Sequence, residues 1–136
     1  MEDSKVSYLQ MIQNVITRMA ENSFKIKGWA IGVMLAIFSF AGTQGDKRCI
    51  LFTVVPLLVL WCLDTYYLQL ERKYRLFYNV KRENEQDDRP FDMNFNNIKI
   101  EMKDASSISF FKCMFSLTEI LFYITCIVTS IVVYLI

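Results

Sequence analysis

The chain has 136 residues, of which 54% are hydrophobic and 21% charged, and its formal net charge is +1. The apolar residues fall into three long blocks, so the composition excludes a small soluble domain and predicts a polytopic membrane protein. Histidine is absent, which removes the usual general base and the commonest metal ligand. Because no Gly-rich phosphate loop or nucleophile elbow occurs, we predict that the protein is not an enzyme and holds no cofactor.

Residues 1–22 are predicted to form an amphipathic cytoplasmic helix. Apolar side chains recur along it at helical spacing, at Leu9, Ile12, Ile16 and Met19. Its polar face carries little charge, so two interpretations stay open. The helix lies on the inner leaflet, or it packs against another cytoplasmic helix.

Residues 23–68 are predicted to form a transmembrane hairpin, with spans at about 24–43 and 49–66. The first span crosses the membrane only if Lys25 and Lys27, near its start, snorkel to the interface. Small residues repeat every four positions on one face of this span: Gly28, Gly32 and Ala36. This repeat favours close packing of another helix, most simply the second span.

Residues 69–107 are predicted to form a cytoplasmic helix and an extended segment. The helix continues the second span to about residue 85 without a breaker, and its apolar stripe offers a face to the helix over 1–22. Residues 94–103 alternate apolar and polar side chains, which is a strand-like pattern without a partner strand in this chain. The segment either lies extended against the cytoplasmic helices or pairs between subunits. Five charged residues are candidates for an interface or a gate: Asp64, Glu71, Arg72, Arg75 and Lys112.

Asp64, at the inner end of the second span, has two interpretations. It is exposed to water at the membrane interface, or it pairs with Lys112, which is expected at the same depth. Glu71 and Arg75 are four residues apart, in the order that favours an ion pair on a helix.

Residues 108–136 are predicted to form the third transmembrane helix, and Glu119 is a carboxyl placed deep within it. Such a residue is costly in lipid and should face protein or water. It shares the helix with several polar residues, and together they are candidates for lining a pore: Glu119, Thr125, Cys126, Thr129 and Ser130. In the alternative interpretation, the hydroxyls bond back to their own helix and Glu119 acts as structural glue against a neighbour.

Lysine and arginine outside the spans are concentrated before residue 28 and within residues 72–112. The positive-inside rule therefore predicts that the N-terminus and the 69–107 segment are cytoplasmic, with the C-terminus on the opposite side. No signal peptide is visible, because the first apolar block follows acidic residues and precedes no small-residue cleavage site.

Two runs of sequence carry a resemblance to a known family. They are residues 12–29 (IQNVITRMAENSFKIKGW) and 63–72 (LDTYYLQLER), the second followed by Arg75 and Tyr78. With the FDM at 91–93, they resemble small, largely uncharacterised bacterial inner-membrane proteins, similar to the membrane effectors of anti-phage defence systems. The resemblance implies a pore-forming or membrane-disrupting effector controlled by a partner or signal molecule, and it assigns no functional residue.

The expected fold is thus an all-α membrane protein with three transmembrane helices, an amphipathic N-terminal helix and a small cytoplasmic helical extension. The expected function is a homo-oligomeric, channel-like or membrane-permeabilising effector in the bacterial inner membrane. Three spans cannot enclose an aqueous channel, so a pore requires several copies around it.

The alternative is a non-conducting adaptor that recruits a cytoplasmic protein through residues 64–103. A small transporter subunit is disfavoured, because no inverted repeat is detectable. The expected partners are lipid, further copies of the chain and a cytoplasmic protein or signal molecule, and no nucleic acid is predicted.

Overall fold

The computed structural model describes residues 2–83, 93, 106 and 108–136. The described elements are all helical: α1 (Glu2–Gln44), the 3-10 helix η1 (Lys47–Thr53), α2 (Val54–Glu83), α4 (Phe110–Met114) and α5 (Leu117–Leu135). Three stretches are long and apolar enough to cross a membrane, namely Glu2–Gln44, Lys47–Glu83 and Leu117–Leu135. The prediction of an all-α membrane protein with three spanning helices is confirmed.

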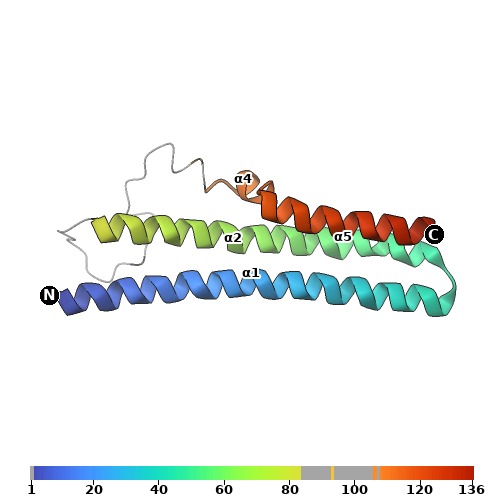
Figure 1. The fold of residues 1–136 in the computed structure, drawn as a ribbon, viewed down its shortest axis with the longest axis horizontal. Helices are drawn as coiled ribbons and strands as arrows, with labels where there is room; N and C mark the ends of the chain where they lie inside the picture. The colour runs from blue at the N-terminus through green and yellow to red at the C-terminus, as the bar shows by residue number, and fades with distance from the viewer. Residues whose placement is uncertain (1, 84–92, 94–105, 107) are drawn as a thin grey trace.

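The three long helices lie side by side in a narrow rod (Figure 1). α1 and α2 are antiparallel along most of its length, and α5 covers only the half next to the α1–α2 turn. The N-terminus and the C-terminus lie at opposite ends of the rod, which agrees with an odd number of spans.

The predicted amphipathic helix and the first span are a single helix. α1 has 43 residues, about 65 Å at the usual helical rise, which is roughly twice the thickness of a hydrocarbon core. No proline interrupts it, and nothing between Glu21 and Phe24 ends a helix. α1 therefore projects well beyond any membrane that its apolar half spans.

The connection between α1 and α2 is a tight turn. Gly45 has a φ of 68°, in the left-handed region that glycine adopts without steric cost. Asp46 then caps η1, accepting a hydrogen bond from the backbone N–H of Arg48 at 2.9 Å. Pro56 lies in the first turn of α2, where a missing N–H is readily tolerated.

Half of the rod is built from two helices. We call residues 2–22 of α1 and 66–83 of α2 the two-helix arm. Its core consists of Tyr8, Ile12, Ile16 and Phe77, all buried. The predicted packing of the amphipathic N-terminal segment against the extension of the second span is confirmed.

The other half, which we call the three-helix half, comprises residues 23–65 and 106–136 where described. Its core contains Ala30 from α1, Leu57 from α2, and Tyr123 and Cys126 from α5. Large apolar side chains are exposed along all three helices here, including Trp29, Val59 and Leu121. Such a surface is stable in lipid and costly in water.

The third span is interrupted, whereas the sequence predicted one continuous helix from residue 108. α4 ends at Met114, and Ser116 is extended, with φ −64° and ψ 142°, before α5 begins at Leu117. Extended backbone is usual for a residue that precedes a helix. Glu119 consequently lies in the first turn of α5 and not well inside a longer helix.

The predicted strand-like segment at 94–103 lies outside the described residues.

Candidate functional site: a charged cluster among three helices

Three charged side chains meet inside the three-helix half, one from each long helix. The Lys27 ammonium bridges the two carboxyls: its Nζ lies 2.8 Å from Glu119 Oε1 and also donates to Asp64 Oδ2. The side chains of Asp64 and Glu119 are 0% and 2% exposed, and that of Lys27 is 21% exposed. The cluster therefore ties α1, α2 and α5 together where their apolar faces meet.

Neutral groups complete the coordination of Asp64. The Ser23 hydroxyl donates to Oδ1, and the Tyr123 hydroxyl donates to Oδ2 at 3.0 Å, with the Leu60 carbonyl at 3.3 Å from the same hydroxyl. Ser23 also accepts from Lys27 Nζ at 3.2 Å. A buried charge requires such hydrogen bonds, because a carboxylate oxygen without a donor raises the free energy of the folded state at low dielectric.

Glu119 is satisfied on one oxygen only. Its Oε1 accepts from Lys27, whereas Oε2 is buried without a hydrogen-bond partner among the described residues. Lys27 Nζ contacts both this carboxyl and that of Asp64. Its position in the first turn of α5 places it near the free N–H groups and positive dipole end of that helix, which favours a negative charge there.

Aromatic rings lie beside the cluster on α2 and α5. Trp61 stacks on Tyr123 with ring centroids 5.7 Å apart and an interplanar angle of 15°. Phe122 packs edge-on against Tyr123 at 5.0 Å, and Lys27 Nζ lies 6.0 Å from the Phe122 ring centroid. Because the two carboxyls are almost fully buried, the charges of the cluster interact at low effective dielectric.

An apolar groove of about 600 Å³ runs between α1 and α5 beside the cluster. It is lined by residues of these two helices: Lys27, Ile31, Met34, Thr118, Leu121, Phe122, Thr125, Cys126 and Thr129. Lys27 is the member of the cluster that reaches it. The groove exists because α2 packs against both neighbours while α1 and α5 hardly meet each other.

The candidate pore-lining residues separate into two sets. Glu119, Cys126 and Ser130 are buried against the neighbouring helices, whereas Thr125 and Thr129 are exposed along the groove. The three candidates that carry hydroxyls donate back to carbonyls of α5: Thr125 to Leu121 at 2.6 Å, Thr129 to Thr125 at 2.8 Å and Ser130 to Cys126 at 3.0 Å. The alternative interpretation predicted these bonds, since in it the hydroxyls bond back to their own helix.

Asp64 differs from both of its interpretations. It is fully buried and pairs with Lys27, while Lys112 lies exposed on α4 with its Nζ 3.5 Å from Ser106 Oγ. The break before α5 gives the physical reason, since α4 is not collinear with the span that carries Glu119.

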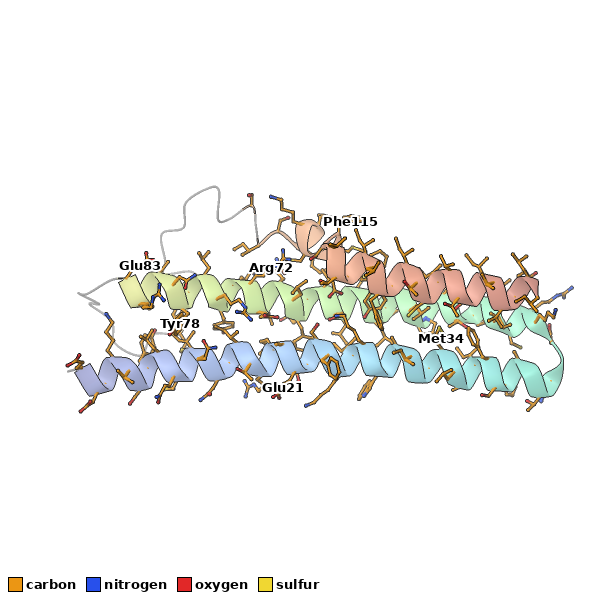
Figure 2. All side chains as sticks on the ribbon, in the orientation of Figure 1. Glu21, Met34, Arg72, Tyr78, Glu83 and Phe115 are labelled. Carbon is orange, nitrogen blue, oxygen red and sulfur yellow. The ribbon has the colours of Figure 1, made fainter. Side chains whose placement is uncertain are left out.

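The other candidate gating residues make contacts at the α4–α5 junction and within the two-helix arm. The Arg72 guanidinium donates to Ser116 Oγ at 3.1 Å, beside the α4–α5 junction near Phe115 (Figure 2). The predicted pair between Glu71 and Arg75 forms, with Arg75 Nη2 2.7 Å from Glu71 Oε1. Neither contact reaches the charged cluster.

The small residues of the first span do not face the second span. Gly28, Gly32 and Ala36 are exposed, and a Cβ added to either glycine meets no other atom within 4 Å. α1 instead contacts the other helices through a different face that carries Ser23 and Ala30. The predicted packing of this repeat against the second span is therefore wrong within the chain.

Sequence reasoning missed Lys27 and Ser23 as site residues, because it placed Lys27 at the membrane interface as a snorkelling lysine. A usable signal was present. Two acidic residues at the same level of different spans favour a cation at that level, and the apolar half of α1 carries its lysines there.

Fold and cluster together define a class: a helical membrane protein with an ion-paired polar centre among three spans. The comparisons add no relative to that class, since no family model, no curated protein and no solved structure matches the chain.

Proposed function

We propose that the protein is a homo-oligomeric, channel-like effector that permeabilises the bacterial inner membrane, in the setting of anti-phage defence, and that the charged cluster keeps it closed until it is triggered. The observation that carries the proposal is the buried Lys27–Asp64–Glu119 cluster among three apolar helices. An anchor needs only apolar helices, whereas ionisable groups inside a membrane are costly and usually serve function. The resemblance to defence effectors supplies the setting.

A few polar side chains along the otherwise apolar groove support a pathway between copies. Thr118, Thr125 and Thr129 are exposed along it, and Lys27 reaches it from the cluster. Copies arranged with their grooves toward a common axis would present threonine oxygens and one ammonium each to that axis. Hydroxyl and charged groups that ring an axis are the elements of ion pathways.

The cluster supports the closed state, because it links all three helices. Separating α5 from α1 breaks the 2.8 Å pair between Lys27 and Glu119 and leaves charges buried without partners, which costs several kcal/mol. The two-helix arm is joined to the cluster through continuous α1 and α2. A partner or signal molecule that binds the arm would therefore act on both helices that hold Lys27 and Asp64.

Reconstitution tests the proposal. The full chain is placed in liposomes with an entrapped dye, and efflux is compared for the wild type, Lys27→Met and Lys25→Met. We expect severalfold faster efflux for K27M, because its cluster has lost the cation that joins the helices. K25M is the matched control, since Lys25 is an exposed lysine of the same helix turn outside the cluster.

Membrane potential in infected and uninfected cells tests the setting. Depolarisation on infection that requires the protein supports the proposal, and Glu119→Leu should alter it at equal protein abundance. An unchanged potential, together with no efflux from any variant that is folded and inserted, contradicts the channel.

The adaptor remains a second candidate, because one observation favours it. The two-helix arm has its own buried core of Tyr8, Ile12, Ile16 and Phe77, so it is an ordered platform. If the two-helix arm, both helices together, retains the activity when it is attached to an unrelated membrane anchor, the adaptor is correct and the spans only attach it.

A further inference from the structure

The charged cluster holds two carboxyls against one ammonium. With Asp64 and Glu119 both ionised and Lys27 protonated, its formal charge is −1 in a site where the carboxyls are almost fully buried. A net charge at low dielectric is expensive, and the least costly remedy is to bind one more positive charge.

Glu119 Oε2 shows where that charge is missing. This oxygen is buried and has no hydrogen-bond partner among the described residues, and the other oxygen of the same carboxyl shares the Lys27 ammonium with Asp64. Two ionised carboxylates only accept hydrogen bonds and repel each other, whereas a protonated carboxyl donates to an ionised one. A proton held by this pair of carboxyls removes their repulsion and leaves Lys27 facing a single negative charge.

We propose that Asp64 and Glu119 form a proton-binding site, in which one proton is shared between the two carboxyls and balances the cluster with Lys27. The proposal does not depend on whether the protein conducts. A proton suits the site better than a metal ion, since the described residues contain no group of three acidic, cysteine or histidine side chains placed to hold a metal. A proton also requires no cavity.

The groups around the pair are compatible with a single added proton. α1 contributes Lys27, and α5 contributes the Tyr123 hydroxyl, which donates to Asp64. On the side of the junction lie Cys113 of α4 and Arg72 of α2, whose guanidinium donates to Ser116 Oγ. Lys27, at 21% side-chain exposure, borders the groove, so proton exchange is expected to pass its side of the cluster.

Infrared spectra of the full chain in lipid nanodiscs, compared between H₂O and D₂O, test the site. The wild type at neutral pH should show a carbonyl band of a protonated carboxyl that shifts in D₂O. Glu119→Gln and Asp64→Asn each leave one acid against Lys27, which is neutral without the proton, so the band should vanish in both. Glu71→Gln, which removes an acid of the two-helix arm, should leave the band unchanged.

Lys27→Met removes the positive charge from the cluster, so the expected effect on the band is opposite to that of E119Q and D64N. Both carboxyls must then be neutral, so the amplitude of the band should double. Absence of the band in the wild type, or its survival in both E119Q and D64N, overturns the proposal. Loss of the wild-type band when sodium replaces choline in the buffer also overturns it and assigns the site to a metal cation. The wild-type measurements stand even where a variant fails to fold.

Discussion

The two halves of the rod share α1 and α2, but among the described residues only the three-helix half adds a buried charged cluster to its apolar core. In the two-helix arm, α1 and α2 are held by apolar contacts around Ile12 and Phe77, with the Glu71–Arg75 pair on its surface. In the three-helix half, apolar side chains face outward, and a charged cluster lies at the centre. The comparison teaches that the surroundings decide which groups a helix buries. Water drives apolar faces together, while in lipid polar groups and close packing join helices.

The largest expected effect is the loss of the cation from the cluster. Lys27→Met leaves two acids without their ammonium, and removing one partner of a buried ion pair costs about 3–5 kcal/mol. Equilibrium unfolding in mixed detergent micelles measures it, with Lys25→Met as the control. If K27M is as stable as K25M, the charged cluster does not stabilise the three-helix half, and the contrast with the two-helix arm is wrong.

A slightly smaller effect is expected from the core of the arm. Phe77 is fully buried there, and its truncation to alanine should cost about 3 kcal/mol, at the low end for this change because a two-helix core relaxes around a cavity. Hydrogen exchange should show the loss in the arm and not in the three-helix half. Loss of protection around Ala30 and Leu57 would mean that the halves do not unfold separately.

Tyr123→Phe removes one neutral donor from the cluster and keeps its ring. Asp64 retains Lys27 and Ser23 as partners, so the expected cost is about 1 kcal/mol, in the range of single hydrogen bonds between helices in a membrane. The same unfolding assay applies. A cost equal to that of K27M would show that the hydroxyl, and not the charge, holds Asp64.

The smallest effect is expected on the surface of the arm. Glu71→Gln removes an ion pair whose Arg75 side chain is largely exposed, and helix-surface pairs contribute about 0.3–0.5 kcal/mol. The difference from the wild type should disappear at high salt, because exposed pairs are screened. If the loss of unfolding free energy in E71Q does not depend on salt, the Glu71–Arg75 pair behaves as a buried ion pair, and the contrast between the two halves is weaker.

Much of the architecture could be predicted from local pattern. The period of Ile12 and Ile16, the unbroken run through Asp64 and the spacing of Glu71 and Arg75 each reflect neighbours within one helix, and each prediction is confirmed. The site could be predicted only in part. Glu119 and Asp64 stood out because acids are costly in apolar segments, whereas their partner did not, since a lysine near the end of a span ordinarily reaches the interface.

By itself, the sequence determined that this is an α-helical membrane protein with three spans and a helical arm, because apolar length and helical period depend only on residues near one another in the chain. Only the tertiary structure decided that Lys27 bridges Asp64 and Glu119, that the glycine repeat faces outward and that the last span breaks before Leu117. These features depend on the rotation and relative height of three helices, which are set by packing between segments up to 92 residues apart. The charged cluster is thus a property of the assembled helices and of no single one of them.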